Sequence, residues 1–466
     1  MNEKEKNPFL AGPIFQPLLK FMIPVLLANF LQAMYSAVDL MVIGRFADAA
    51  TVQLANAAVG TGSMIMVMVT FVINGLAMGT TVVLGQYIGA KDRTGASKVI
   101  GSAIGIFAVL AVALTMVMEV MAPYFALLMN APSVEMTTVY LRICGGGLIF
   151  ITAYNVMSGI FRGIGNSKLP LLFVGIACVV NIALDLFTVC VLHWDVTGVA
   201  VSTITAQAVS VILSFVMIRR MSLPFDIKPE LIRFHEGLSG KILQAGVPLA
   251  FQDLLTNLSF VVINSVANHL GPDADAWAGI ASGYSVDNKL TTFAMIIPTA
   301  FLQSMAVFTA QNVGAGNRER IQKGLRYMLV TAGGVGVALA LLCEFGGSAM
   351  ASVFTDDAET IGYAAQYLRG YALDCLICAS MLTLLGYFNG CGHATLVLIQ
   401  GLVGSFVVRI PIVLMLRNYE NVTLTHLGLG CASATVASMI ICTGYLIVKT
   451  KNDTMFPPFM RRNGKT

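Results

Sequence analysis

The sequence has few charged residues. Lys, Arg, Asp and Glu together make up 11% of its 466 residues, whereas hydrophobic residues make up 57%. A soluble globular domain has about 25% charged residues, and these cover the surface that faces water. A chain with so little charge cannot cover such a surface. The composition therefore excludes a soluble protein and predicts an integral membrane protein.

Motifs for nucleotide and metal chemistry are also missing. The sequence has no G-x-x-x-x-G-K-[ST] loop and no H-E-x-x-H, and its five histidines are dispersed. Cys375 and Cys378 form a C-x-x-C pair, but it lies in an apolar run without a second pair, so we interpret both as small buried residues. We expect no enzyme, no cofactor and no nucleic-acid partner. Any work must then draw on an ion gradient.

Long apolar runs occupy most of the chain. A spanning helix needs about 20 mainly apolar residues, and a window of that length predicts an all-α membrane protein with twelve transmembrane helices. The predicted spans are residues 16–43, 55–80, 97–121, 135–157, 169–192, 196–218, 242–268, 279–305, 324–348, 362–387, 394–416 and 426–448.

Basic residues gather in alternate loops. Cytoplasmic loops collect Lys and Arg, and "KDRTGASK" (91–98), "NRERIQKGLR" (317–326) and the tail 449–466 all fall on one side of the predicted topology. The opposite loops hold acidic residues. We therefore expect a multi-pass protein of the cell membrane with both termini in the cytoplasm.

The chain repeats itself at an offset of about 225 residues. "QYIGAKDR" (86–93) recurs as "QNVGAGNR" (311–318), and "GIFRGIG" (159–165) recurs as "GYFNGCG" (386–392). Pro24 near the start of the first span has a counterpart in Pro248, and both are expected to bend their helices. The repeat predicts two pseudo-symmetric six-helix bundles around a central cavity, which suits alternating access. The predicted domains are an N-lobe (1–218), a cytoplasmic linker (219–241), a C-lobe (242–448) and a basic tail (449–466).

Polar residues inside the predicted spans are the candidate functional residues. A carboxylate at the bilayer centre costs at least ~2.5 kcal/mol, and it avoids that cost by taking a proton or binding a cation. Helical spacing places one set of polar residues of the first span on a single face, and Asn181 with Asp185 on a face of the fifth. Thr203 lies in the sixth span. The first-span set is Gln32, Tyr35, Ser36 and Asp39.

Two interpretations of Asp39 and Asp185 stay open at this point. The pair, with nearby amide and hydroxyl oxygens, can bind a proton or Na⁺. Alternatively, each aspartate is satisfied by a neighbour and only holds helices together. The second half of the chain has other candidates and carries Ile263 at the counterpart of Asp39. These candidates are Asp253, Asp287, Lys289, Asp374 and Arg409.

The chain resembles multidrug and toxic compound extrusion (MATE) transporters of the bacterial type. The resemblance covers essentially the whole chain and rests on "YSAVDLMVIGRF" (35–46), "QYIGAKD" (86–92), "FRGIGNSKLPL" (161–171) and "NIALDLF" (181–187). It implies an antiporter that exports cationic or amphipathic compounds in exchange for H⁺ or Na⁺.

The resemblance also implies roles for particular residues. It assigns ion coupling, and a possible Na⁺ site, to Asp39, Asn181, Asp185 and Thr203, with Ser202 and Thr205 close to the last. Gln32 and Asn155 would line the cavity. A second cation site in the C-lobe is in doubt, because the sequence has Thr256 where another branch has an acid, so Asp253 and Asp374 remain candidates for binding a cationic substrate.

Two other functions remain open. One is a transporter for a dedicated endogenous metabolite or lipid-linked cargo on the same scaffold. The other is a membrane scaffold or sensor that transports nothing. The sequence favours a small-molecule exporter in the lipid bilayer, expected to be a monomer, and does not decide between H⁺ and Na⁺.

Overall fold

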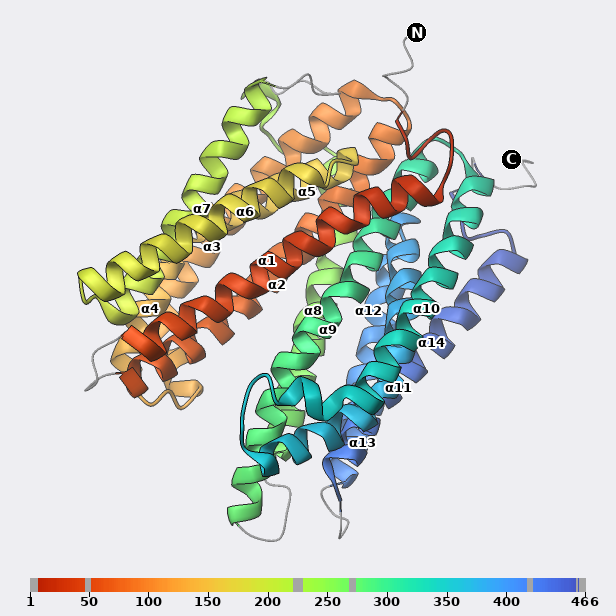
Figure 1. The fold of residues 1–466 in the computed structure, drawn as a ribbon. Helices are drawn as coiled ribbons and strands as arrows, with labels where there is room; N and C mark the ends of the chain where they lie inside the picture. The colour runs from red at the N-terminus through yellow and green to blue at the C-terminus, as the bar shows by residue number, and fades with distance from the viewer. Residues whose placement is uncertain are drawn as a thin grey trace. The chain divides into compact units, whose positions relative to one another are not determined.

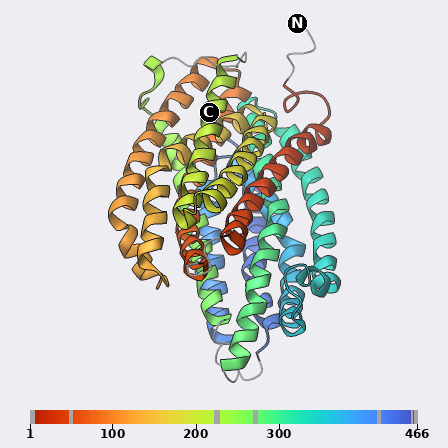
Figure 2. The same ribbon diagram turned by 60° about the vertical axis from the view of Figure 1, so that its left-hand side comes forward.

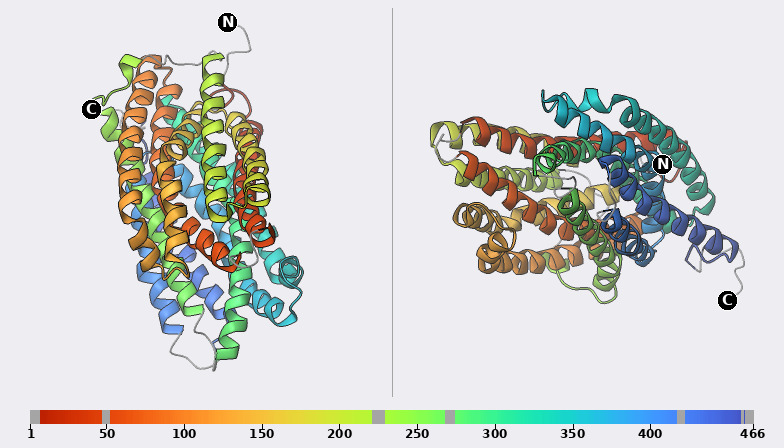
Figure 3. Two further views of the ribbon diagram at one scale, coloured as in Figure 1. Left: turned by 90° about the vertical axis from the view of Figure 1, so that its left-hand side faces the viewer. Right: turned by 90° about the horizontal axis from the view of Figure 1, so that it is seen from below.

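The computed structural model describes residues 7–46, 52–220, 229–267, 274–416, 422–457 and 460, and every regular element in these ranges is helical (Figure 1). Inside a membrane the backbone must satisfy its own polar groups, and a helix does so within one segment. The predicted all-α fold class is confirmed. Figures 2 and 3 show the same helices from other sides.

The first half of the described chain starts two of its helices with capping side chains. Asp92 accepts a hydrogen bond from the backbone N–H of Gly95 (2.8 Å), and Ser133 accepts one from that of Met136 (3.3 Å). The helices are α1 (Phe15–Phe46), α2 (Val52–Gly89), α3 (Arg93–Leu128), α4 (Val134–Gly146), α5 (Leu148–Ile164), α6 (Lys168–Asp185), the π-helix η2 (Leu186–Val191) and α7 (Asp195–Arg220).

The second half also consists of helices. They are the short 3₁₀-helix η3 (Pro229–Leu231), α8 (Leu238–Ala267), α9 (Ala274–Gly314), α10 (Arg318–Ala351), α11 (Ala358–Gly390), α12 (Ala394–Leu402), the π-helix η4 (Val403–Arg409), α13 (Ile410–Leu416) and α14 (Leu424–Lys451). Pro24 and Pro248 lie inside α1 and α8, which both continue past them.

The predicted twelve spans are all present. In the described ranges eleven segments are long and apolar enough to cross a membrane, and the bent pair α4 and α5 makes a twelfth if it counts as one span. The two parts of this pair meet at 51° at Gly147. A β-carbon on Gly147 would lie 2.2 Å from Cδ1 of Ile204 on α7, so a larger residue at this bend would require the Ile204 side chain to move.

The chain divides into two compact units. Residues 23–250 form one, which we call the N-unit, and residues 1–22 with 251–466 form the other, the C-unit. The lobes predicted from the sequence repeat, 1–218 and 242–448 with the linker 219–241, remain a prediction. Residues 221–228 of that linker and most of the tail beyond residue 457 lie outside the described residues.

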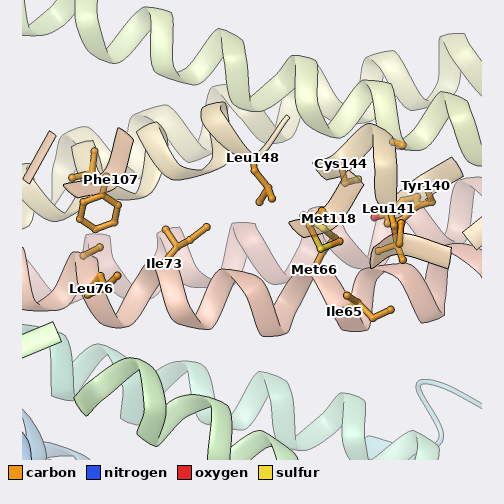
Figure 4. Close-up of a cluster of buried hydrophobic side chains, with 14 of the residues drawn as sticks. Ile65, Met66, Ile73, Leu76, Phe107, Met118, Tyr140, Leu141, Cys144 and Leu148 are labelled. Atoms are coloured by element: carbon orange, nitrogen blue, oxygen red, sulfur yellow. The ribbon is translucent and has the colours of Figure 1, made fainter. Parts of the chain in front are cut away.

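Each unit has its own apolar core. In the N-unit the core joins α2, α3, α4 and α5 (Figure 4). The side chains labelled there are Ile65, Met66, Ile73, Leu76, Phe107, Met118, Tyr140, Leu141, Cys144 and Leu148. In the C-unit the core draws on α9, α10, α11 and α14, and it contains buried Tyr284, Tyr367 and Cys431.

The segment before α1 is fastened to the start of α10 within the C-unit. We call residues 7–13 the N-strap. The guanidinium of Arg320 donates from Nε to the carbonyl of Phe9 and from Nη1 to that of Gly12, both at 2.7 Å. The Phe9 ring packs edge-on against two other rings. Arg320 Nη2 also reaches the carbonyls of Pro8, Ala11 and Pro13 at 3.2–3.3 Å.

A second strap, residues 229–237, lies on α3 within the N-unit. The backbone N–H of His235 donates to Ser102 Oγ (3.3 Å), and a β-carbon on Gly101 would meet the carbonyl oxygen of Leu231 at 1.9 Å. Gly12 (φ +74°) and Gly237 (φ +75°) share a left-handed backbone conformation and lie 225 residues apart, the offset of the repeat. The first long helix of the first half, α1, therefore begins in the C-unit, and that of the second half, α8, begins in the N-unit.

Candidate functional site

Two aspartates of the N-unit are buried on two helices. Asp39, near the end of α1, is 7% exposed, and Asp185, the last residue of α6, is 0% exposed. Asn181 is buried one turn before Asp185 on the same face. Directly after Asp185 the helix changes to the π-helix η2, and such π-turns inside α-helices are frequent at functional sites.

Four predicted side chains meet here. The Asp39 carboxylate interacts with the side chains of Asp185, Asn181 and, from α7, Thr203. None of these contacts has the geometry of a full hydrogen bond. Asp39 Oδ1, both carboxylate oxygens of Asp185, both amide atoms of Asn181 and Thr203 Oγ1 are buried without a full hydrogen bond. We call this group the aspartate-pair site, and it has more buried oxygen atoms than its neighbours satisfy.

The structure separates the three hydroxyl residues of α7 that the sequence left close together. Thr203 reaches Asp39, and Ser202 reaches Asp185 instead. Ser202 Oγ also donates to the carbonyl of Gly198 at 2.9 Å. Thr205 is exposed. Thr203 is therefore the hydroxyl on the Asp39 side of the site.

A second layer of polar residues lies next to Asp39 on α1. Tyr35 lies near the side chains of Gln32 on the same helix, of Gln207 on α7 and of Tyr154 on α5. Sequence reasoning missed Gln207. It lies four residues after Thr203 and so shares a face of α7 with it, which is the signal that could have identified it.

The other predicted cavity residues of the N-unit are less informative. Asn155 is buried, and its Nδ2 donates to the carbonyl of Ile151 at 2.8 Å, a bond within its own helix. The backbone of Ser36 belongs to α1, but its side chain lies outside the described residues. That these residues line a substrate cavity stays a prediction.

The acidic residues of the C-unit have different surroundings. Asp374 accepts a hydrogen bond from Thr435 Oγ1, interacts with Tyr371 and lies in electrostatic range of Arg409. Arg409 is 7% exposed, donates from Nη1 to a serine hydroxyl (2.9 Å) and covers a phenylalanine ring at 4.6 Å. Asp253 is partly buried, and within the described ranges no hydrogen bond or ion pair joins it to Asp374.

The pairing of Asp287 with Lys289 that the sequence left open does not form. Asp287 is 0% exposed, whereas Lys289 is exposed and its Nζ lies 6.0 Å from the ring centre of Phe354. Ile263, the counterpart of Asp39, is buried in the apolar core. The described part of the C-unit therefore has no copy of the aspartate-pair site.

The aspartate-pair site has the chemistry of a proton or alkali-cation site. Among the described residues, no three His, Cys, Asp or Glu side chains lie close enough to hold a metal ion together. The site offers only carboxylate, amide and hydroxyl oxygens, which suit hard cations rather than the softer transition metals. Intramembrane acids of this kind mark ion and substrate pathways.

A fold of many spanning helices with buried acids facing amides and hydroxyls defines a polytopic membrane transporter. The chain belongs to the MatE family, whose sequence model matches residues 24–187 and again residues 248–415. The family consists of transporters rather than enzymes, and the resemblance inferred from the sequence is confirmed.

Individual relatives agree over nearly the full chain. A probable multidrug resistance protein, YpnP of Bacillus subtilis, is 25% identical over 425 residues, covering 91% of this chain and 93% of that protein. NorM of Thermotoga maritima, also described as a probable multidrug resistance protein, is 23% identical and covers 90% and 89%. The outward-facing structure of a multidrug resistance MATE family transporter has a TM-score of 0.87 at 20% identity, covering 97% and 99%. This last likeness concerns the fold alone.

Proposed function

We propose that the protein is a secondary antiporter that exports cationic or amphipathic compounds, including drugs, in exchange for H⁺ or Na⁺. The relatives named for multidrug resistance support the cargo class. The observation that carries the ion coupling is the aspartate-pair site, where two buried carboxylates of the N-unit lie together with unsatisfied oxygens. Among the described residues of this unit no base is fully buried, and the partly buried Arg162 of α5 lies near Tyr154.

The coupling follows from the electrostatics of the pair. Two carboxylates in a low-dielectric interior repel each other, and a proton or Na⁺ between Asp39 and Asp185 removes that repulsion. Binding therefore favours the arrangement in which the two side chains are close and dry. Loss of the ion favours an arrangement in which water reaches them. Transport requires that ion and cargo favour opposite arrangements, because a ligand that binds both equally shifts nothing.

The dedicated-cargo alternative has less support. An anionic or lipid-linked cargo would need free basic side chains within the spans. Arg409, the buried base of the C-unit among the described residues, already donates to Ser259, covers Phe260 and faces Asp374. We therefore favour a cationic cargo, with Asp253 and Asp374 as candidate contacts. We further propose a monomer in the cell membrane, with both termini and the linker in the cytoplasm.

The decisive experiment is transport by the purified full chain in liposomes. Efflux of a fluorescent lipophilic cation is followed under an imposed H⁺ gradient and then an Na⁺ gradient. We expect one gradient to drive efflux, with at least a tenfold loss of rate in Asp39→Asn. The matched control is Asp357→Asn, which removes an exposed carboxylate and should leave the rate unchanged. Efflux that persists in Asp39→Asn under the same gradient contradicts the assignment of coupling to this site, and absence of efflux under both gradients contradicts the antiport proposal for this cargo class.

A further inference from the structure

Asp287 of α9 is a buried acid that the proposed exchange does not use. Its side chain is 0% exposed, and both carboxylate oxygens are buried without a hydrogen bond. The hydroxyl of Thr291, one turn later on α9, donates to the backbone carbonyl of Asp287 at 2.8 Å and not to the carboxylate. No donor of the described protein therefore stabilises a negative charge at this position.

The titratable groups that face Asp287 are themselves weak partners. From α10, Cys343 lies in electrostatic range of the carboxylate, and its Sγ lies 3.6 Å from Cys375 Sγ of α11. Along α9, Tyr284 is near Asp287, and its ring packs edge-on against that of Tyr367 of α11 with 5.2 Å between the ring centres. A thiol is a weak donor, and the tyrosine donates no hydrogen bond to the carboxylate, so neither group balances an ionised Asp287.

The more distant charged groups do not balance it either. Arg409 of η4 and Cys431 of α14 reach Tyr284, not Asp287 itself. Asp374 of α11 lies near Cys343 and would add a second negative charge to the same region. Lys289, the nearest base in sequence, is exposed. Every charged group around Asp287 is therefore acidic, distant or turned away.

Asp374 provides the internal comparison. It accepts a hydrogen bond from Thr435 Oγ1, and Tyr371 and Arg409 lie in range of its carboxylate. The fully buried charged side chains of the described C-unit are Asp287, Asp374 and Arg409. One base is present for two acids, and Arg409 lies in electrostatic range of Asp374 and not of Asp287. Asp287 is then the unmatched acid, and an unmatched buried charge is neutralised rather than tolerated.

We propose that Asp287 is a proton-binding carboxyl of the C-unit, protonated in the arrangement described here and able to give its proton to water when that arrangement opens. A proton is favoured over a metal cation because the facing groups are thiols and tyrosines, whereas alkali and alkaline-earth cations require several oxygen ligands. In the release step the carboxyl O–H bond breaks, the electron pair stays on the carboxylate, and water accepts the proton. The burial of Asp287 stands independently of the exchange proposed above; only its release during transport rests on that exchange.

Infrared difference spectroscopy of the full chain in lipid tests the protonation directly. The carbonyl stretch of a protonated carboxyl is absent from a carboxylate. We expect this band, measured at neutral pH, to lose intensity equal to one carboxyl in Asp287→Asn and none in the control Asp357→Asn, which removes an exposed acid. Should Asp287→Asn fail to fold, Asp287→Glu keeps the acid and should shift the band instead. If the variant loses carboxylate intensity, or the band stays in place in Asp287→Glu, Asp287 is ionised and the proposal is wrong.

Adding the fluorescent cation to the same samples tests release. A decrease of the Asp287 band on addition of the cation, absent in Asp287→Asn, supports proton exchange during transport. An unchanged band in a protein that transports the dye overturns the release step alone. Failure of dye transport with the band present overturns the proposed exporter function and leaves the protonated Asp287 in place, so the two failures are distinguishable.

Discussion

Replacing Arg320 with alanine should release the N-strap from the C-unit. The two short hydrogen bonds, from Nε to Phe9 and from Nη1 to Gly12, are both 2.7 Å long. A hydrogen bond from a charged donor contributes about 1.5–3 kcal/mol when well formed. Arg320 is only partly buried and the bond to Gly12 is at the surface, so the lower end applies. We expect the strap to lose about 3 kcal/mol of local stability.

Hydrogen exchange of the full chain measures this loss. The backbone N–H of Phe9 donates to Asn7 Oδ1 and that of Leu10 to the Asn7 carbonyl, both at 3.0 Å. These amides exchange only when the strap opens locally. A loss of about 3 kcal/mol corresponds to roughly 100-fold faster exchange. The core of α11, far along the chain in the same unit, should keep its wild-type exchange.

The matched control is Lys323→Ala, one turn further along α10. It removes the same charge, but Lys323 pairs with Glu319 on the exposed surface, and solvent screening leaves such i,i+4 pairs little effect on stability. Exchange in the strap should stay within about twofold of wild type in this control. If Arg320→Ala gives the same exchange as Lys323→Ala, the carbonyl contacts do not hold the strap and the reasoning fails.

Two further predictions concern α11. Gly370→Ala should destabilise the protein by about 1–3 kcal/mol in thermal denaturation, because the new β-carbon would lie 2.1 Å from the carbonyl oxygen of Thr425 on α14. The control Gly362→Ala has nothing within 4 Å of its new β-carbon and should be neutral or slightly stabilising in the same assay. Equal effects of the two substitutions would contradict the packing argument. The side-chain and backbone donors of Thr360 hold the pKa of Asp357, which caps the helix, below its ordinary value. Because this pKa is depressed on folding, the cap stabilises the protein above the unfolded pKa and the effect is lost as pH falls through the folded pKa. Asp357→Ala should therefore lower the melting temperature at neutral pH, with a difference that shrinks as the pH falls below about 4 and is lost below the folded pKa. A difference that persists undiminished in strong acid would show that the charge of the cap is irrelevant.

The sequence predicted the spans because hydropathy is read directly from residue type. Each of the twelve predicted segments overlaps an apolar helix or, for 135–157, the bent pair α4 and α5. The bend itself was not predicted. It occurs at Gly147, where the side chain of Ile204 packs closely against the backbone, and that approach depends on the packing of α7 rather than on the local sequence.

The buried acids were predictable for a related reason, since charged residues in apolar runs are rare enough to be recognised singly. Helical spacing placed Asn181 on the face of Asp185 and Tyr35 on the face of Asp39, and the family resemblance joined the two faces and Thr203 into one site. Gln207 was missed because glutamine is not rare enough to stand out in a span. The contacts of Arg320 were missed because backbone carbonyls carry no sequence signal, and any residue of the N-strap could have supplied them.

The two halves share a scaffold but differ in how buried charge is balanced. Gly95, the repeat counterpart of Arg320, leaves the second strap without a guanidinium, and Ile263 replaces Asp39 in the C-unit. Among the described residues, the fully buried charged side chains are two acids in the N-unit and Asp287, Asp374 and Arg409 in the C-unit. Arg409 lies in electrostatic range of Asp374 and partly offsets its charge, so Asp374 has less need of an external ion than Asp287. The acids without a buried base can be neutralised only by a mobile ion, H⁺ or Na⁺, that binds and is later released. Such reversible neutralisation is the property that coupling to an ion gradient requires.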